Sequence, residues 1–268
     1  MRLAWATDIH LDHATESARR KFCLAVNEQA DALVVTGDIA ESHILGSALT
    51  ALATLTERPV YFVLGNHDFD RGSIAGTRRQ VDYVVGEGLV YLSQAGVVEL
   101  TPNTALVGHD GWADGRLGDL DRSVVILNDF LLIDELQCWR DSHNLDKPAL
   151  RRMLATLGDE AAEYLRSVLV PAAAKYPHVI VATYVPPFRE AAWYQGRPSA
   201  DDFLPLFACK AMGDVLLEVA QSYPGCQILV LCGHTHGGSE LAVQNNLHVM
   251  TGRAEYGKPR IEIVLVAE

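Results

Sequence analysis

Four short segments of the chain carry side chains that can bind a metal ion. They contain Asp8 and His10, then Asp38 after Gly37, then Asn66, His67 and Asp68 after Gly65, and finally His234 and His236. In an extended chain, residues two apart point the same way, so Asp8 and His10 can share one ion. Carboxylate, imidazole and amide oxygen ligands together suit manganese, iron or zinc. One such segment would be a weak indication, but four of them predict a metal centre.

Apolar runs before these segments predict the strands that position them. Residues 3–7, 32–36 and 60–64 are short apolar runs, and helix-like sequence lies between them at 17–30 and 46–55. This alternation predicts βαβ units and a sheet that begins parallel. Ligands of open α/β sheets lie at the carboxyl ends of strands, so we expect the metal-binding segments to meet at one edge.

The rest of the chain continues the alternation less regularly. Helices are predicted over residues 71–86, 147–168 and 210–221, and Gly158 is expected to kink or split the second of them. Strands are predicted over residues 97–100, 104–107, 179–183, 228–231, 247–251 and 261–266, of which the last two are expected to complete a second sheet. Residues 108–116 are predicted to form a loop, residues 188–205 an irregular stretch, and residues 118–146 show no clean period.

The composition is that of an ordinary globular protein. The chain has 268 residues, of which 49% are hydrophobic and 21% charged, which suffices for a large α/β core. No linker-like stretch divides the chain, so residues 1–268 are expected to form a single domain. The N-terminus runs directly into a strand and leaves no room for a signal peptide, and no apolar run reaches membrane-spanning length. We therefore expect a cytoplasmic location and no membrane partner.

Cysteine usage and charge narrow the expected surroundings. The five cysteines contain no CxxC pair, and most are expected to be buried thiols in a reducing compartment; they are Cys23, Cys138, Cys209, Cys226 and Cys232. A formal charge of -12 disfavours binding of long nucleic acid over the whole surface. A phosphate substrate would need local positive charge, which metal ions supply. The expected partner is a small phosphorylated molecule or a phosphopeptide, with the oligomeric state left open.

In their order and spacing, the four segments resemble the motifs of the calcineurin-like metallophosphoesterases. That family has an Asp-x-His, a Gly-Asp, a Gly-Asn-His followed by Asp or Glu, and a Gly-His-x-His, which match the segments that begin at Asp8, Gly37, Gly65 and Gly233. The resemblance runs from residue 8 to residue 236, nearly the whole chain. It implies an α/β fold, a four-layer sandwich of two mixed β-sheets flanked by helices, with a dinuclear metal site on one rim.

The resemblance also implies roles for individual residues. Asp8, His10, Asp38 and His236 would hold the first of two divalent or mixed-valence ions, and Asp38 would bridge to a second ion held also by Asn66 and His234. His67 would protonate the leaving oxygen or stabilise the transition state while a hydroxide between the ions attacks phosphorus. The predicted catalytic residues are therefore His67, Asp38 and Asp68. Asp68 would either accept a hydrogen bond from His67 or cap the helix that follows.

This implied reaction is hydrolysis of a phosphate ester. Monoester and diester substrates remain equally open, so the chain is expected to be a phosphatase or a phosphodiesterase. A nucleotide or cyclic-nucleotide phosphodiesterase is a second possibility within the same class.

One expected ligand of the second ion is replaced. The family has a histidine after a later strand, whereas this chain has Tyr184 at that place, before Pro186 and Pro187. A phenolate would be a good ligand, but the ordinary tyrosine pKa of about 10 requires a strong Lewis acid such as ferric iron. Tyr184 would then either ligate the second ion or turn away and leave that site weak. The alternative to an active enzyme is a weakly active or non-catalytic metal-binding member of the same fold.

Two loops carry side chains suited to substrate recognition. One contains Trp112 and Arg116, and the other contains Trp193 and Arg197 together with Arg189, Tyr194 and Ser199. Arginine binds phosphate oxygens with two parallel hydrogen bonds, and aromatic faces stack on rings. We predict substrate contacts for Asn66, His67, Arg197, Trp193, Trp112 and Arg116, although a packed lid with solvated arginines is the plainer interpretation. His109 would be a peripheral site residue or a structural one.

Overall fold

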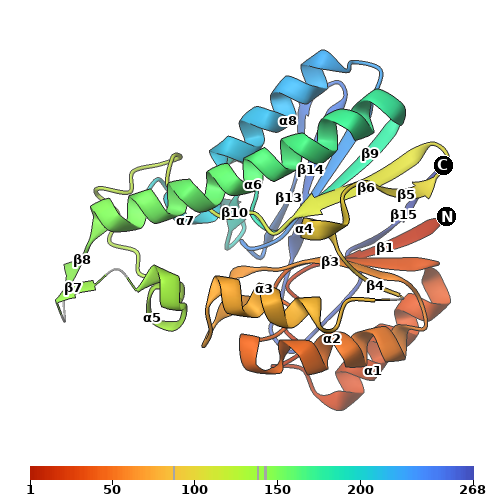
Figure 1. The fold of residues 1–268 in the computed structure, drawn as a ribbon, viewed down its shortest axis with the longest axis horizontal. Helices are drawn as coiled ribbons and strands as arrows, with labels where there is room; N and C mark the ends of the chain where they lie inside the picture. Colours follow the sequence, from red (N-terminus) through yellow and green to blue (C-terminus); the bar gives the residue numbers. More distant parts are fainter. Residues whose placement is uncertain (87, 138, 142–143) are drawn as a thin grey trace.

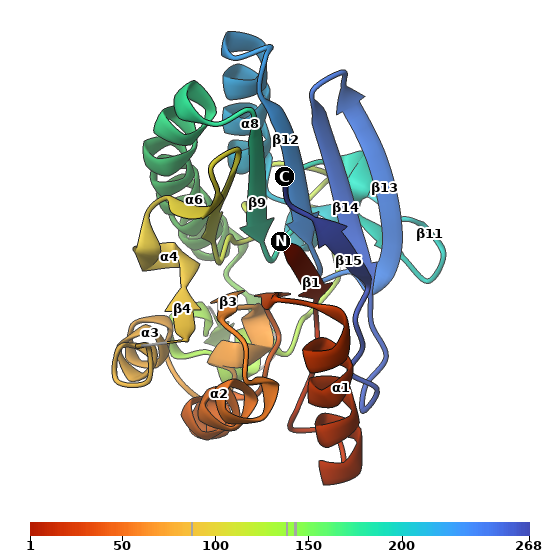
Figure 2. The ribbon, with the colours of Figure 1, turned by 90° about the vertical axis from the view of Figure 1, so that its right-hand side faces the viewer.

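A computed structural model of the chain describes residues 1–86, 88–137, 139–141 and 144–268. Two β-sheets face each other and helices cover their outer faces, as Figures 1 and 2 show from two directions. The first sheet has the order β15-β1-β2-β3-β4, and the second has the order β13-β14-β12-β9-β6-β5. The predicted four-layer α/β sandwich of two mixed sheets is confirmed.

The first sheet is parallel except at one edge. Its strands are β1 (Arg2–Ala6), β2 (Ala32–Thr36), β3 (Val60–Val63), β4 (Leu89–Tyr91) and β15 (Ile263–Val266), and β15 runs antiparallel to β1. The prediction that residues 261–266 complete the second sheet is therefore wrong. An apolar strand at an edge fits either sheet by its sequence, and here it pairs with β1.

The second sheet mixes parallel and antiparallel pairs. Its strands are β5 (Val98–Thr101), β6 (Thr104–His109), β9 (His178–Thr183), β12 (Gln227–Cys232), β13 (Gly237–Gln244) and β14 (Leu247–Arg253). Strand β13 was not predicted, because two glycines and several polar residues interrupt its pattern. In the part of the chain that the structure describes, two short antiparallel pairs lie outside the sheets: β7 (Trp139–Asp141) with β8 (Asn144–Leu145), and β10 (Trp193–Tyr194) with β11 (Arg197–Pro198). The second pair forms a hairpin in the stretch predicted to be irregular.

Among the described residues, five long helices form the outer layers. α1 (Glu16–Gln29), α2 (Ser42–Thr56) and α3 (Ile74–Asp82) cover the first sheet, and α6 (Lys147–Lys175) and α8 (Lys210–Ser222) cover the second (Figure 1). Gly158 does not split α6, contrary to expectation. A Cβ atom at Gly158 would lie 2.4 Å from the Cβ of Asp114, so glycine allows close packing there. The remaining short helices are η1 (Asn66–Phe69), α4 (Leu92–Ala95), α5 (Asp129–Leu132), η2 (Asp134–Leu136), η3 (Arg189–Ala191) and α7 (Leu204–Phe207).

Strand β1 shows why the strands of the first sheet have continuous apolar sequences. Leu3 and Trp5 pack in the core between the sheets, whereas Ala4 and Ala6 belong to the cluster under α1 and α2. A strand buried on both faces needs apolar residues at every position. Both faces of the sheet are thereby fixed, which holds the carboxyl ends of its strands in place.

The stretch without a clean period, residues 118–146, reaches back to the loop after β3. The backbone N–H of Arg71 donates to the carbonyl of Leu132, and the N–H of Asp134 donates to the carbonyl of Gly72. The Glu135 carboxylate accepts hydrogen bonds from the first backbone N–H groups of α3. These contacts dock α5 beside the loop that carries Asn66 and His67.

The structure also bears on the expectations for the cysteines and for membrane-spanning segments. Cys23, Cys209, Cys226 and Cys232 are buried free thiols, and Cys138 lies outside the described residues. Over the part of the chain that the structure describes, no helix combines the length and the apolar character that crossing a membrane requires.

Candidate metal centre

The four predicted segments meet at one edge of the sandwich. Each follows the carboxyl end of a strand: the first three come after the parallel neighbours β1, β2 and β3, and the fourth comes after β12 in the facing sheet. The two sheets therefore bring residues more than 220 positions apart in the sequence into contact, since the backbone N–H of His234 lies 3.2 Å from both carboxylate oxygens of Asp8.

Asp8, His10, Asp38 and His236 form a compact ligand set. One ligand atom from each lies within 4.8 Å of the others. His236 Nε2 is 3.3 Å from Asp8 Oδ1, and His10 Nε2 is 3.7 Å from Asp38 Oδ2. His10 Nε2 and Asp38 Oδ2 are buried without a hydrogen-bond partner. Buried polar atoms are rarely left unpaired, so these two atoms fit a metal ion that both would ligate.

The backbone at the ligand residues is held in an unusual conformation. Residues Asp8, His10, Asp38, His234 and His236 have φ angles of 47°, 37°, 50°, 70° and 56°. Such left-handed conformations cost free energy for residues other than glycine and persist where the surrounding structure enforces them. Their concentration at the predicted ligands is independent support for a functional site here.

Burial sets the charge of the ligand residues. Burial lowers the pKa of His10 to about 3 and that of His234 to about 4, so both imidazoles are neutral and have a lone pair for a metal. Burial raises the pKa of Asp38 well above its ordinary value, and the nearby carboxylates of Asp8 and Asp68 add to this effect. A cation in the site would relieve this cost by stabilising the ionised Asp38.

Asp68 supports the loops rather than the ring of His67. Its Oδ1 accepts hydrogen bonds from the backbone N–H groups of Ile39 and Ala40, and its Oδ2 accepts one from the N–H of Gly65. The carboxylate is fully buried. It bonds to backbone N–H groups around the η1 turn, as the predicted cap would, and not to the ring of His67. Asp68 therefore joins the two loops that carry Asp38 and Asn66, and the predicted hydrogen bond from His67 to Asp68 is wrong, because His67 pairs with Asp70.

His67 lies beside the ligand set and pairs with a different carboxylate. Its Nδ1 is 3.1 Å from Asp70 Oδ2, and its Nε2 is 4.0 Å from Asp38 Oδ2. Burial alone would lower the pKa of His67, but the carboxylates of Asp38, Asp70 and Asp129 raise it to about 10. The side chain is 26% exposed and so reaches the surface of the site. The sequence contained Asp70 three residues after His67, and a search for carboxylates near that histidine would have found it.

Asn66 is oriented by a residue that sequence reasoning missed. Its Nδ2 donates to Asp129 Oδ1 at 2.9 Å, which leaves its Oδ1 buried and unpaired. Burial raises the pKa of Asp129 to about 6. The stretch around Asp129 lacks periodicity, so no sequence pattern indicated that it reaches the site.

Tyr184 points into the site. Its hydroxyl lies 3.2 Å from Asp8 Oδ1 and 3.2 Å from His234 Nδ1. The residue is 2% exposed. Of the two alternatives for Tyr184, the one in which it turns away from the site is therefore wrong. Burial, together with the charges of Asp38 and Asp8, raises the pKa of its phenol well above 10.

The pocket above the ligands contains few of the predicted substrate contacts. It encloses about 330 Å³, and its walls include Asn66 and His67 as predicted, with Tyr194, Phe207 and Tyr256 adding aromatic surface. Tyr256 was missed by sequence reasoning; its ring centroid lies 4.3 Å from that of His10. Aromatic residues in irregular loops have many possible neighbours, so the sequence gave no sign of this contact.

The other predicted substrate residues lie elsewhere. Trp112 is buried in the core, where its ring centroid is 5.6 Å from that of Phe69, so it is a packing residue. Arg116 forms ion pairs with Asp114 and Asp159 outside this pocket. Trp193 and Arg197 lie on the β10–β11 hairpin, but the hairpin residue that lines the pocket is Tyr194. His109 is buried, and its Nδ1 accepts a hydrogen bond from the N–H of Gly111.

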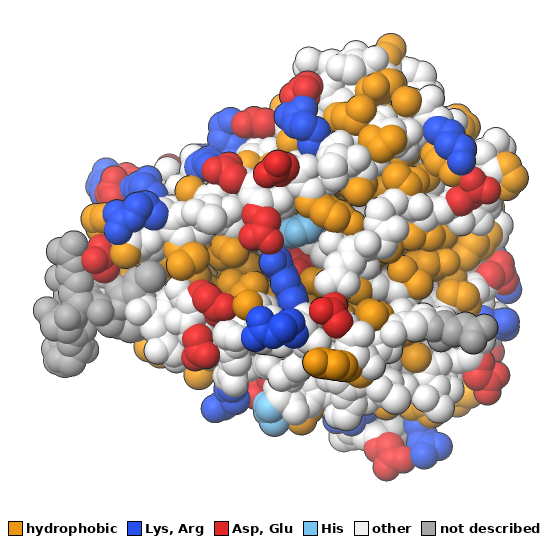
Figure 3. All heavy atoms as spheres, in the orientation of Figure 1, with side chains coloured by type: hydrophobic (Ala, Val, Ile, Leu, Met, Phe, Trp, Pro, Cys, Tyr) orange, Lys and Arg blue, Asp and Glu red, His pale blue; other side chains and the backbone are white. Residues whose placement is uncertain are grey.

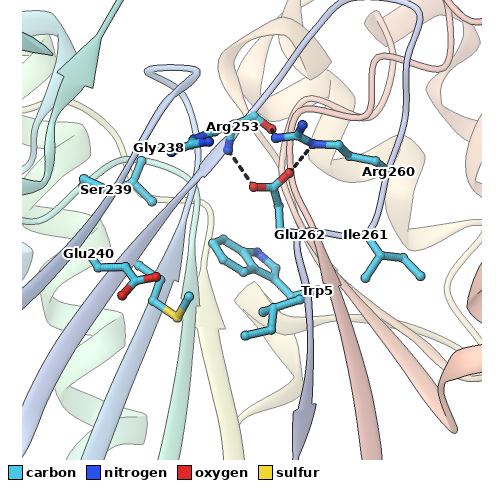
Figure 4. Close-up of a pocket in the computed structure, with 11 residues that line it drawn as sticks. Trp5, Gly238, Ser239, Glu240, Arg253, Arg260, Ile261 and Glu262 are labelled. Carbon is cyan, nitrogen blue, oxygen red and sulfur yellow. Dashed lines mark hydrogen bonds and ion pairs between the residues drawn. The ribbon is translucent and has the colours of Figure 1, made fainter. Parts of the chain in front are cut away.

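A separate cavity of about 600 Å³ opens between the edges of the two sheets (Figure 4). Trp5 and Met250 are among its lining residues, and Glu262 accepts hydrogen bonds from the backbone of Arg253 and from the side chain of Arg260. None of the predicted ligands lines it. We therefore place the candidate site at the smaller pocket, where the ligand set lies.

Comparisons with known proteins agree with this geometry. The profile of the calcineurin-like phosphoesterase family matches residues 1–238. No curated protein sequence matches the chain. Solved structures that resemble the chain include a dimetal phosphatase from Danio rerio, with 16% identity over 94% of this chain and 86% of that one and a TM-score of 0.60. Another is a phosphopantetheinyl hydrolase from Mycobacterium tuberculosis, with 13% identity over 97% and 94% and a TM-score of 0.64. A third is a 5′-nucleotidase from Candida albicans, with 12% identity over 94% and 46% and a TM-score of 0.50.

Proposed function

Because the chain belongs to the calcineurin-like phosphoesterase family, and is therefore a hydrolase of phosphate esters, we propose that it acts as a metal-dependent phosphatase or phosphodiesterase in which His67 assists the leaving group. The observation that carries this proposal is the convergence of Asp8, His10, Asp38 and His236 within 4.8 Å, with His67 beside them.

The residues of the first ligand set would hold a transition metal ion. Their carboxylate and imidazole ligands suit manganese, iron or zinc. When bound, such an ion supplies Lewis-acid chemistry: it polarises the phosphoryl group and makes water more acidic. The unpaired Nε2 of His10 and Oδ2 of Asp38 support this assignment, because both atoms would otherwise stay buried and unsatisfied.

His67 has the chemistry of a general acid. The carboxylates of Asp38, Asp70 and Asp129 raise its pKa above the ordinary histidine value, which favours the protonated ring. Asp70 accepts the Nδ1–H, so Nε2–H remains available on the side of Asp38 and the ligand set. A proton held at Nε2 is suited to the oxygen that leaves phosphorus, and such proton transfer contributes about 10²- to 10⁴-fold to rates.

The size and walls of the pocket support a small substrate. A volume of about 330 Å³ fits a phosphorylated small molecule or the phosphorylated side chain of a peptide. On the face shown in Figure 3, basic and acidic side chains are interspersed, which does not favour a long polyanion. Tyr194 and Tyr256 offer aromatic surface to a ring in the substrate, and we propose a cytoplasmic location for this activity.

A second candidate function follows from Tyr184. Its hydroxyl contacts Asp8 and His234. The family has a histidine ligand of the second ion at the place of Tyr184. This contact favours a weakly active or non-catalytic metal-binding protein of the same fold. The two candidates differ in turnover rather than in fold.

Hydrolysis of bis(p-nitrophenyl) phosphate and p-nitrophenyl phosphate tests the proposal. Protein supplied in turn with manganese, iron, zinc or nickel should release nitrophenol from at least one substrate, and His67→Ala should remove most of that activity. The preferred substrate assigns the protein as a phosphodiesterase or a phosphatase. No turnover of either compound with any of the metals would favour the non-catalytic candidate.

A further inference from the structure

Tyr184 is fixed in place by its backbone and by its ring. The residue follows β9, its N–H donates to the carbonyl of Asp110, and its carbonyl accepts from the N–H of Gly233. A Cβ atom at Gly37 would lie 2.3 Å from the Cδ2 of Tyr184, and one at Gly65 would lie 2.8 Å from its Cε2. The two glycines thus make room for the ring directly behind Asp38 and Asn66, and the ring has no space to swing away.

The hydroxyl of Tyr184 occupies the side of His234 that a metal would need. His234 Nε2 lies 2.9 Å from the carbonyl oxygen of Leu206. A carbonyl only accepts, so Nε2 carries the ring proton and Nδ1 carries the lone pair. That lone pair faces the Tyr184 hydroxyl at 3.2 Å. The phenol has a single O–H, which donates either to this nitrogen or to Asp8 Oδ1, and in both cases the phenol oxygen occupies the space in front of the one atom by which neutral His234 could bind an ion.

This arrangement leaves too few ligands for a second ion. The resemblance assigns Asp38, Asn66, His234 and one further residue to that ion. With His234 Nδ1 facing the Tyr184 hydroxyl, the unpaired atoms of this set are Asp38 Oδ2, which the first ligand set already uses, and Asn66 Oδ1. Catalytic sites for metals such as zinc ordinarily use three protein ligands or more. A neutral phenol adds a hydrogen-bond donor and no good ligand in their place.

We infer that Tyr184 closes the second metal position, so that this chain binds one metal ion, at Asp8, His10, Asp38 and His236, where the family resemblance implies two. The inference rests on the proposed metal-dependent function and specifies its cofactor. In the site so formed, the Tyr184 hydroxyl stands within hydrogen-bond distance of Asp8 Oδ1.

Metal content per chain tests this inference without an activity assay. Wild-type protein is stripped of metal, reloaded with excess manganese, freed of unbound metal and measured by elemental analysis. We expect one ion per chain in the wild type and two in Tyr184→His, which restores an imidazole at this place. The electron paramagnetic resonance spectrum of the manganese-loaded wild type should show isolated ions, and that of Tyr184→His should show coupled pairs.

A matched substitution controls for the added imidazole. Tyr176 is also buried, but its hydroxyl bonds to Glu99 away from the site, so Tyr176→His should still bind one ion. Circular dichroism checks that each variant is folded. Two ions in the wild type would overturn the inference, and so would one ion in a folded Tyr184→His protein. Failure of the proposed function can be told apart from failure of this inference. It would appear as absent turnover in the nitrophenyl assays, whatever number of metal ions each chain binds.

Discussion

The Nδ1 of His67 lies 3.1 Å from the Oδ2 of Asp70, three residues further along the chain. This contact orients the ring with its other nitrogen on the side of Asp38, whose Oδ2 is 4.0 Å away. His67 in the η1 turn and Asp70 directly after it lie at the rim of the ligand set. The pair therefore explains how one short turn holds both a proton donor and the group that orients it.

Substitution within this pair should separate chemistry from metal binding. His67→Ala should lower kcat for the better nitrophenyl substrate by about 10²- to 10⁴-fold, because the leaving oxygen loses its proton donor. Asp70→Asn should lower kcat less than His67→Ala does, since the ring stays in place but loses its charged partner. Elemental analysis should give unchanged metal content in both variants. A His67→Ala protein with wild-type kcat would refute the role of this histidine.

Gly37 is a position where the structure forbids a side chain. Its φ is +84°, and an added Cβ would lie 2.3 Å from the Tyr184 ring. Gly37→Ala should therefore reduce the free energy of unfolding by more than about 1–3 kcal/mol, the usual cost of such backbone strain alone. Urea unfolding measures this change. Gly225→Ala serves as the control, because a Cβ there meets open space. Equal stability of the two variants would show that the ring does not pack as described.

Asp129 should affect activity through Asn66. Asp129→Ala removes the acceptor of the Asn66 amide, which then loses its orientation toward the site. Supporting groups of this kind typically change activity by about 10- to 100-fold, and we expect a fall in kcat in that range. Asp134→Ala, at an exposed position in the same stretch, should leave kcat unchanged. Loss of activity in both variants alike would instead indicate general disruption of the stretch.

His109 should make the protein less stable in acid. Burial lowers its pKa, an effect to which Arg78 adds and which Asp110 and Glu160 oppose. The unfolded chain therefore takes up the proton first as the pH falls. The stability that neutral His109 contributes is present above its unfolded pKa of about 6.5 and declines below it, by up to about 1.4 kcal/mol per pH unit.

Comparison of two histidine variants isolates this effect. His109→Asn keeps an acceptor for the Gly111 N–H and removes the titrating ring. The free energy of unfolding should fall less steeply between pH 7 and pH 5 in His109→Asn than in the wild type. His43→Asn, at a side chain that is 59% exposed, should follow the wild type. Parallel curves for His109→Asn and the wild type would rule out this source of acid sensitivity.

The sequence predicted those parts of the fold and site that depend on local pattern. Strands β1, β2 and β3 are apolar because both faces are buried, and the ligand residues follow directly at their ends. The family resemblance of these segments implied the grouping of Asp8, His10, Asp38 and His236 on one ion. Strand β15 was assigned to the wrong sheet, because an edge strand carries no mark of the neighbour it pairs with.

Contacts made across the chain escaped prediction. Asp129 reaches Asn66 from 63 residues away, through a stretch docked by backbone hydrogen bonds that any sequence can make. Tyr184 was recognised as a departure, but its direction depends on the room left by Gly37 and Gly65, which are distant in sequence. Trp112 was expected at the substrate and lies in the core, because aromatic residues serve both purposes equally well.

Metal-dependent turnover tests the central claim most directly. The measurement is kcat/KM for bis(p-nitrophenyl) phosphate and p-nitrophenyl phosphate in manganese-loaded wild type, in the same protein after chelation, and in Asp38→Asn, whose metal content is measured in parallel. We predict turnover of at least one substrate in the loaded wild type, its loss after chelation with recovery on adding metal back, and little metal or turnover in Asp38→Asn. Equal rates in all three samples, or no turnover in fully loaded wild type, would contradict a phosphoesterase built on this ligand set.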